Sequence, residues 1–183
     1  MSKISLAPDA SGTGIFTIAS PNSNTNRTLT LPDDTGTIDR LNRAGNVLQV
    51  VQTSQSTEIT TSSTSYVDTG LTASITPTNA SNKILVVVLQ NGIIKQTQDT
   101  TLSLQLLRDA TQIAISTGNA WTGTTDGNQI GAVGWTILDS PNTTSSVTYK
   151  TQYANRTGSG TVGVQWAFGG PNTSTITLME IAG

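Results

Sequence analysis

The chain has 183 residues, of which only 11% are charged, and its formal net charge is −2 at pH 7. A typical soluble domain carries about 25% charged residues, so hydroxyl and amide side chains must supply most of the polar surface here. The nine basic residues are scattered along the chain, which excludes a cationic patch for nucleic acid or for an anionic membrane surface.

The first predicted element lies within residues 12–37, GTGIFTIASPNSNTNRTLTLPDDTGT. Two short strands would place Phe16 and Ile18 on one face, then Leu29 and Leu31 on one face, with a loop of Pro, Asn, Ser and Thr between them. An Asp-Asp-Thr-Gly turn sequence closes the segment. An isolated two-stranded hairpin is marginally stable at best in water. We therefore expect these apolar side chains to be buried against copies of the segment or against another protein.

Residues 39–46, DRLNRAGN, separate this hairpin from the rest of the chain. They form the most charge-rich stretch, show no period-two pattern and end in a Gly-Asn pair, which breaks regular structure. The sequence therefore predicts three parts. These are an N-terminal β-arm for trimerisation and attachment (residues 1–38), a linker (residues 39–46) and a knob (residues 47–183).

Beyond the linker the sequence predicts strands separated by turns. Residues 83–90 are apolar on both faces, which predicts a central strand covered on both sides. The pair Asn91-Gly92 directly after it is a strong turn signal. The predicted strands are residues 47–53, 66–69, 71–76, 83–90, 101–108, 112–116, 131–138, 146–153, 162–168 and 174–181.

Strands at roughly 10–15-residue spacing, with no credible helix, indicate an all-β fold, an antiparallel β-sandwich of jelly-roll type. Trp135, Trp166, Tyr149 and Tyr153 alternate in phase with aliphatic neighbours, which predicts core positions. Trp121 lies in a loop rich in Gly, Thr and Asn, outside any alternation. An exposed Trp marks a contact surface, so Trp121 is a candidate for surface recognition. The alternative is a loop Trp folded back onto the core.

The residue types offer little for catalysis. Histidine and cysteine are absent, which removes the commonest general base and the most reactive nucleophile. Most acidic residues fall in turns, where they typically bond their own backbone. Zinc-type ligand sets are absent, and Asp126-Gly127-Asn128 favours a plain turn over a calcium site. The sequence therefore predicts a non-enzymatic protein with no catalytic, cofactor-binding or metal site.

The sequence also carries no signal for a membrane location. The first eight residues lack the apolar run of a signal peptide. The longest apolar run, residues 84–89, is far too short to span a bilayer. We therefore expect a soluble chain made in a cytoplasm, with no membrane partner.

The pattern GTGxFTIxxPxxNTNRTLTLPDxTGT in residues 12–37 resembles a segment that recurs in structural proteins on the outside of tailed bacteriophages, especially cyanophages and related aquatic phages. Those proteins are trimeric tail-fibre, head-fibre and capsid-decoration chains. Residues 77–86 and 174–183 are similar in kind to the β-knob of such appendages. The resemblance implies a homotrimer on the outer surface of a virion, synthesised in the host cytoplasm. It also implies assembly or attachment roles for Phe16, Ile18, Arg27, Leu29 and Leu31.

Three functions follow as hypotheses. The first is a capsid-decoration (cement) protein whose N-terminal segment clamps the major capsid protein. The second is a short tail fibre or receptor-binding chain, held by a tail or adaptor protein, whose knob contacts a host surface glycan. The third, a carbohydrate-active enzyme or lectin module, ranks last. The sequence favours decoration over a fibre, because neither heptads nor shaft repeats lie between Thr37 and Val47.

Overall fold

The computed structural model describes residues 11–15, 17, 19, 22–26, 28, 43–121, 131–157, 160–167, 169–170 and 172–183. The chain divides into two units, Met1–Thr37 and Ile38–Gly183. In the first unit the described positions form no strand, and the side chain of Ile15 is 93% exposed. The five attachment residues of the sequence prediction, Phe16, Ile18, Arg27, Leu29 and Leu31, all lie outside the described residues.

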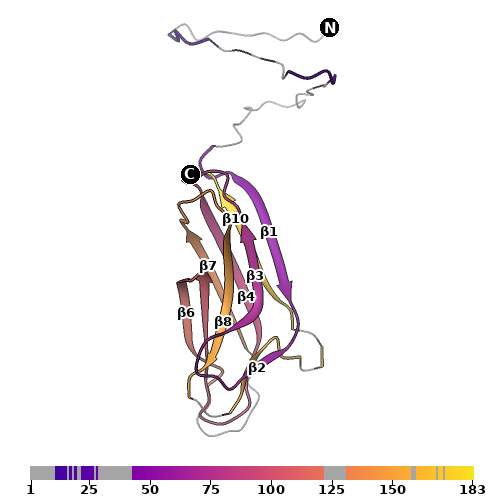
Figure 1. Ribbon diagram of the computed structural model, residues 1–183, viewed down its shortest axis with the longest axis vertical. Helices are drawn as coiled ribbons and strands as arrows, with labels where there is room; N and C mark the ends of the chain where they lie inside the picture. The colour runs from indigo at the N-terminus through magenta and orange to yellow at the C-terminus, as the bar shows by residue number, and fades with distance from the viewer. Residues whose placement is uncertain are drawn as a thin grey trace. The chain divides into compact units, whose positions relative to one another are not determined.

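The second unit is built from β-strands, and its described residues contain no helix (Figure 1). The strands are β1 (Val47–Gln55), β2 (Ile59–Thr61), β3 (Val67–Ile75), β4 (Lys83–Lys95), β5 (Leu102–Arg108), β6 (Thr111–Asn119), β7 (Gly131–Asp139), β8 (Val147–Asn155), β9 (Val162–Val164) and β10 (Ser174–Ile181).

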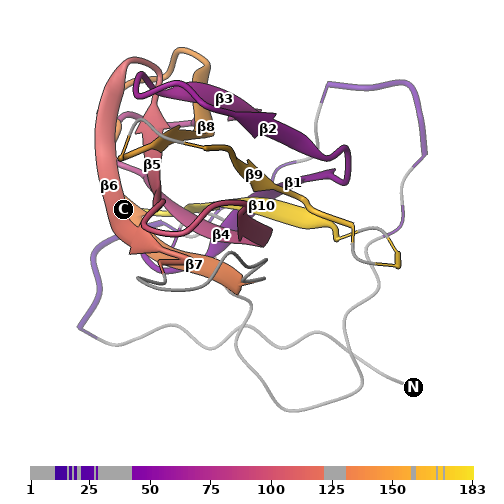
Figure 2. The same cartoon turned by 90° about the horizontal axis from the view of Figure 1, so that it is seen from below.

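These strands form two antiparallel sheets that pack face to face (Figure 2). The first sheet has the order β1-β10-β4-β9-β2, with β7 on the other edge of β4, and the second has the order β3-β8-β5-β6. Leaving aside the three-residue strands β2 and β9, a four-stranded sheet β1-β10-β4-β7 faces a four-stranded sheet β3-β8-β5-β6. This eight-stranded double-sheet arrangement is a jelly roll. The predicted all-β sandwich is confirmed.

The core lies between the sheets because buried and more exposed positions alternate along the long strands, with apolar side chains at most of the buried positions. The predicted leucine row of β5, Leu102, Leu104 and Leu106, is fully buried, and so are Tyr149 and Tyr153 of β8. On β4 the inward side chains Ile84, Val86 and Val88 are at most 2% exposed. Trp135 is partly buried and packs against both apolar clusters of the core.

The predicted strand over residues 162–168 is wrong in its second half. Strand β9 ends at Val164, and Gln165 takes a φ of 55°, in the left-handed region that ends regular pairing. As a result Trp166 is only half-buried and belongs to neither core cluster, so its predicted core position is also wrong.

The predicted turn at Asn91-Gly92 is wrong as well, because both residues lie inside β4. The pairing of β4 with β7 shifts register between Gln90 and Ile93, and Gly92 has a φ of 61°. A glycine in this conformation is typical of a β-bulge. The bulge is the point where β4 leaves β10, which it pairs up to Leu89, and begins to pair with β9.

Gly70 marks a second β-bulge, in β3. The sequence predicts two strands on either side of it, whereas the structure has one strand with a register shift between Asp68 and Thr72. Gly70 has a φ of 78°. A bulge bends a strand without ending it, so the chain continues across the sheet.

The start of β1 and the end of the chain lie side by side. Gly45 N donates to Ala182 O at 2.9 Å, and Ala182 N donates to Asn46 O at 2.9 Å. Register then places Lys83, which pairs with Ile181, at the same end of the sandwich. We call this the linker end, because residues 43–46 lead into β1 there.

Candidate interaction surfaces

The outer surface of strands β1, β10, β4 and β7 is the first candidate. Register aligns Val50, Met179, Leu85 and Leu138 in one row across the four strands, on the side away from the core. The next row is Gln52, Thr177, Val87 and Thr136, and the third is Ser54, Thr175, Leu89 and Gly134. We call this surface the apolar face, after its aliphatic members Val47, Val50, Leu85, Val87, Leu89, Leu138, Met179 and Ile181.

The apolar face is open to solvent in the single chain. Val50 is 57% exposed, Leu138 is 53% exposed and Leu89 is 44% exposed, while Leu85 and Val87 are half-buried. The prediction that residues 83–90 form a central strand is confirmed, since β4 lies between β10 and β7. The prediction that both sides are covered is wrong for the single chain, because only the inner side meets the second sheet.

Charge is almost absent from the apolar face. The strands of this sheet carry four charged residues, Lys83, Lys95, Asp139 and Glu180. Lys95 and Glu180 are fully buried. Asp139 accepts hydrogen bonds from Arg108 Nη1 at 2.8 and 2.9 Å, in the opposite sheet. Only Lys83 therefore presents a charge on the outer side.

The same Asp139 carboxylate accepts a hydrogen bond from the Tyr149 hydroxyl at 2.7 Å. Burial, together with this hydrogen bond and the charge of Asp139, raises the pKa of Tyr149 well above its ordinary range. Tyr149 therefore stays neutral and keeps donating, which ties β8 to β7 across the sandwich.

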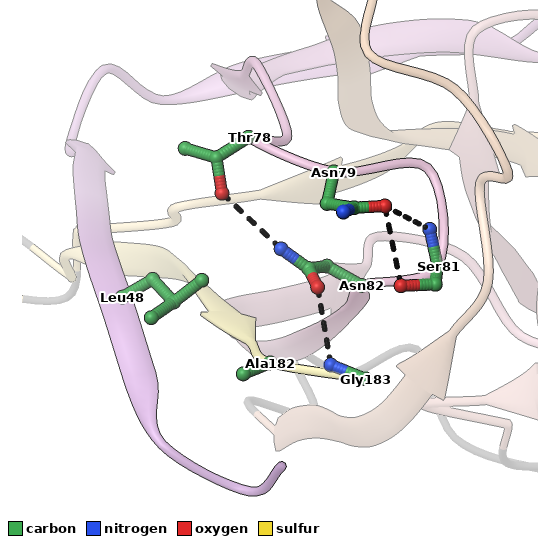
Figure 3. Close-up of a pocket in the computed structure, with 7 residues that line it drawn as sticks. All are labelled: Leu48, Thr78, Asn79, Ser81, Asn82, Ala182 and Gly183. Atoms are coloured by element: carbon green, nitrogen blue, oxygen red, sulfur yellow. Dashed lines mark hydrogen bonds between the residues drawn. The ribbon is translucent and has the colours of Figure 1, made fainter. Parts of the chain in front are cut away.

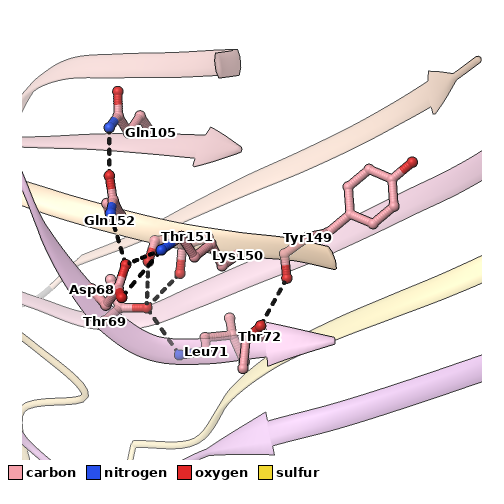
Figure 4. A network of polar contacts seen from close by, with 9 residues as sticks. All are labelled: Asp68, Thr69, Leu71, Thr72, Gln105, Tyr149, Lys150, Thr151 and Gln152. Carbon is pink, nitrogen blue, oxygen red and sulfur yellow. Dashed lines mark hydrogen bonds and ion pairs between the residues drawn. The ribbon is translucent and has the colours of Figure 1, made fainter. Parts of the chain in front are cut away.

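The outer side of the second sheet is chemically different (Figure 4). Gln105 Nε2 donates to Gln152 Oε1 at 2.8 Å, and Gln152 Nε2 donates to Asp68 Oδ1 at 2.7 Å. Lys150 forms an ion pair with Asp68 at 2.9 Å. Burial raises the pKa of Asp68, but the hydrogen bonds from Gln152 and Lys150 outweigh it and lower the pKa overall. Polar groups here bond to one another along the sheet, as on a sheet that faces water.

A pocket of about 280 Å³ lies at the linker end (Figure 3). Asn82 is its centre, since Asn82 Nδ2 donates to Thr78 Oγ1 at 3.2 Å and Asn82 Oδ1 accepts from Gly183 N at 3.1 Å. Asn79 Oδ1 accepts from both the backbone and the hydroxyl of Ser81. The lining residues are Leu48, Thr78, Asn79, Ser81, Asn82, Ala182 and Gly183. These contacts hold the last residues of the chain against the loop between β3 and β4.

The Glu180 carboxylate anchors the same loop. It is fully buried and accepts from Asn82 Nδ2 at 2.6 Å, Gln49 Nε2 at 2.6 Å, and Thr78 N and Oγ1 at 2.6 and 2.8 Å. Burial raises the pKa of Glu180, but these hydrogen bonds outweigh it and lower the pKa overall. The carboxylate therefore remains charged and is stabilised by neutral donors, which makes it a structural clasp.

Trp121 lies at the end of the sandwich opposite the linker. Strand β6 starts beside Arg108, which contacts Asp139 at the linker end, and runs away from it to Asn119. Trp121 follows directly and is 60% exposed, so it is not folded onto the core. Its role in recognition stays a prediction.

Sequence reasoning found Trp121 but missed the apolar face. The alternation of Leu85 and Val87 on β4 was a visible signal, whereas Val50 and Leu138 join it only through pairings far apart in sequence. Asp126 and Asn128 lie outside the described residues. Across the residues that the structure does describe, no three acidic side chains gather as a metal site would require. Nor does the described part of the chain contain a helix long and apolar enough to cross a membrane.

No protein-family model and no curated protein matches the chain. Among solved structures it is similar to a chain of the VP2 subviral particle of infectious bursal disease virus, with 9% identity and a TM-score of 0.47. That match covers 74% of this chain and 33% of the viral chain. A chain from the structure of the Gt strain of that virus has 12% identity and a TM-score of 0.42, with 86% and 42% covered. The chain thus spans less than half the length of these proteins, and likenesses at this level carry no argument about function.

Proposed function

We propose that this chain is a non-enzymatic structural protein of a virion, a homotrimeric capsid-decoration protein that attaches to the major capsid protein. The observation that carries the proposal is the apolar face, a nearly uncharged sheet surface with exposed aliphatic side chains, suited to contact with another protein surface. The resemblance of residues 12–37 to a segment of phage virion surface proteins supports the virion setting. In this proposal residues 1–38 attach the chain to the capsid, and residues 39–46 connect this arm to the knob. Residues 47–183 form the knob on the outer surface of the virion.

A short tail fibre or receptor-binding protein is the second candidate. One observation favours it, namely that Trp121 is exposed at the end of the knob opposite the linker. A chain anchored through its linker end would present Trp121 outward, where it could stack on a host surface glycan.

The copy number of the chain in purified particles distinguishes the two. A decoration protein is expected at a copy number comparable to that of the major capsid protein, measured by quantitative mass spectrometry. A copy number close to that of tail proteins would contradict decoration and favour the fibre. Absence from purified particles would contradict both.

Replacing Leu29 and Leu31 together with aspartate is expected to release the protein from the particle. Two carboxylates placed in an apolar contact would cost several kcal/mol, on the order of 2–7 kcal/mol for each unpaired polar group. Co-sedimentation of the protein with particles measures attachment. Replacing Thr28 and Thr30 with aspartate is the matched control, since these alternate with the leucines in the predicted strand. Retention of the double leucine variant would place the anchor in the knob.

A further inference from the structure

The apolar face is as large as patches that often have a function. Four strands at about 4.8 Å spacing and seven residues at about 3.4 Å rise give a footprint of roughly 460 Å², polar positions included. That lies in the range of the largest apolar patches on monomeric proteins, about 300–600 Å², which are often functional. The outer side of the second sheet carries by contrast the Asp68–Lys150 ion pair.

We infer that the apolar face is the surface through which copies of this chain contact one another around a threefold axis. The inference rests on the proposed homotrimer and names its interface. A partner rich in charge would find only Lys83 to pair with, and its other charges would be desolvated without compensation. The apolar face of a second copy carries no charge besides its own Lys83.

The polar groups of the face can also pair with themselves. The middle row contains Gln52, Thr177 and Thr136. Hydroxyl and amide groups each donate and accept hydrogen bonds. Identical faces can therefore satisfy one another, which carboxylates alone or ammonium groups alone cannot do.

The register is compatible with cyclic symmetry. Val50 on β1 and Leu138 on β7 lie at opposite ends of one row, and so at similar heights along the strands. Rotation about an axis parallel to the strands keeps height unchanged. It brings the β1 side of one copy against the β7 side of the next, so that Val50 meets Leu138. Cyclic symmetry also places every linker end on the same side of the assembly, as attachment to one capsid surface requires.

The first test is the oligomeric state of the full chain at micromolar concentration, by light scattering after size exclusion. The wild type is expected to be a trimer, and Val50→Asp combined with Leu138→Asp is expected to raise the dissociation constant at least 100-fold and give monomers. Both side chains are more than half exposed, so the single copy keeps its fold, checked by circular dichroism. Ile115→Asp is the matched control, because Ile115 is 47% exposed on the other sheet and should leave the trimer intact. The inference would be overturned if the Val50→Asp, Leu138→Asp variant remained a trimer. It would also be overturned if Ile115→Asp weakened the trimer as much as the double variant does.

The second test uses the absence of cysteine in the chain. Val50→Cys with Leu138→Cys in one chain cannot form an internal disulfide, because three strand spacings separate them by about 14 Å and a disulfide needs Cα atoms within about 7 Å. Mild oxidation is expected to give covalent trimers on a non-reducing gel. Ser74→Cys with Ile115→Cys, on opposite edges of the second sheet, should give none. Absence of cross-linking in the first pair, or ladders longer than three, would overturn the inference.

These outcomes are separable from the proposed virion role. A chain found on particles at high copy number but not cross-linked through Val50 and Leu138 would overturn the interface and leave the virion role standing. A chain that forms the cross-linked trimer but is absent from particles would overturn the virion role and leave the interface standing.

Discussion

Gly92→Ala is expected to lower the free energy of unfolding by about 3 kcal/mol or more. Gly92 has a φ of 61°, and an added Cβ would lie 2.7 Å from the carbonyl carbon of Gln165 and closer still to the backbone nitrogen of Trp166. A left-handed conformation costs a non-glycine residue about 1–2 kcal/mol, and overpacking adds about 1–3 kcal/mol. The crowding atoms are backbone, so relief requires moving the chain that pairs with β4.

The movement would break two hydrogen bonds at the bulge. Gln165 N donates to Asn91 O at 2.9 Å, and Trp166 N donates to Gly92 O at 3.1 Å. Urea unfolding measures the loss. Gly118→Ala is the control, because Gly118 has a φ of 77° with nothing within 4 Å of its added Cβ, and it should cost only about 1–2 kcal/mol. Equal costs at the two sites would show that crowding at the bulge is not decisive.

Glu180→Ala is expected to lower the free energy of unfolding by on the order of 3 kcal/mol. The substitution removes the acceptor for donors on Gln49, Thr78 and Asn82. Asn82 is only 5% exposed, so its amide loses a charge-assisted bond without reaching water. An unsatisfied buried donor costs about 1–3 kcal/mol, and more for groups that bonded a charge. Urea unfolding at neutral pH measures the difference. A decrease in the free energy of unfolding of less than about 1 kcal/mol would contradict a stabilising role for these hydrogen bonds.

The pH dependence of stability tests the same carboxylate. Its pKa is lower in the folded state than the ordinary value of about 4.3. Ionised Glu180 therefore contributes stability above about pH 4.3, and this contribution is lost as the pH falls through the folded pKa. The stability difference between wild type and Glu180→Gln should shrink on acidification. A difference for Glu180→Gln that does not change with pH would contradict this assignment.

Much of the fold could be predicted because a strand with one buried side alternates apolar and polar residues with a period of two. The predicted strand 174–181 matches β10, whose Ile176 and Leu178 are fully buried. The leucines of β5 were recognised for the same reason. With eight strands of this kind and no helical pattern, the sandwich class follows from the need to bury each apolar side.

The errors fall where long-range pairing decides the local structure. Asn-Gly fits both a hairpin turn and a bulge, and at Asn91-Gly92 only the presence of β9 beside the end of β4 selects the bulge. The aliphatic alternation of residues 162–168 likewise predicts a longer strand than β9. No local signal marks Gln165 as the residue where the chain turns away.

The candidate surface was partly visible in the sequence. Residues 83–90 are apolar on both sides, which predicted a central strand but did not show that its outer side is open to solvent in the single chain. The sequence could not show that the second surface extends to Val50 and Leu138, since this depends on register between strands more than 50 residues apart. The predicted attachment residues of the arm lie outside the described residues, and their roles stay predictions.

The side-by-side hydrogen bonding of Gly45 and Asn46 with Ala182 determines how the knob bears mechanical load. A pull between the linker and residue 183 would separate β1 from β10 at one end and break their hydrogen bonds one after another, at low force. A pull between the linker and a ligand held near Trp121 would instead slide β1 along β10, so that the bonds from Val47 to Gln55 share the force. The knob should therefore resist tension along its length far better than peeling at its linker end.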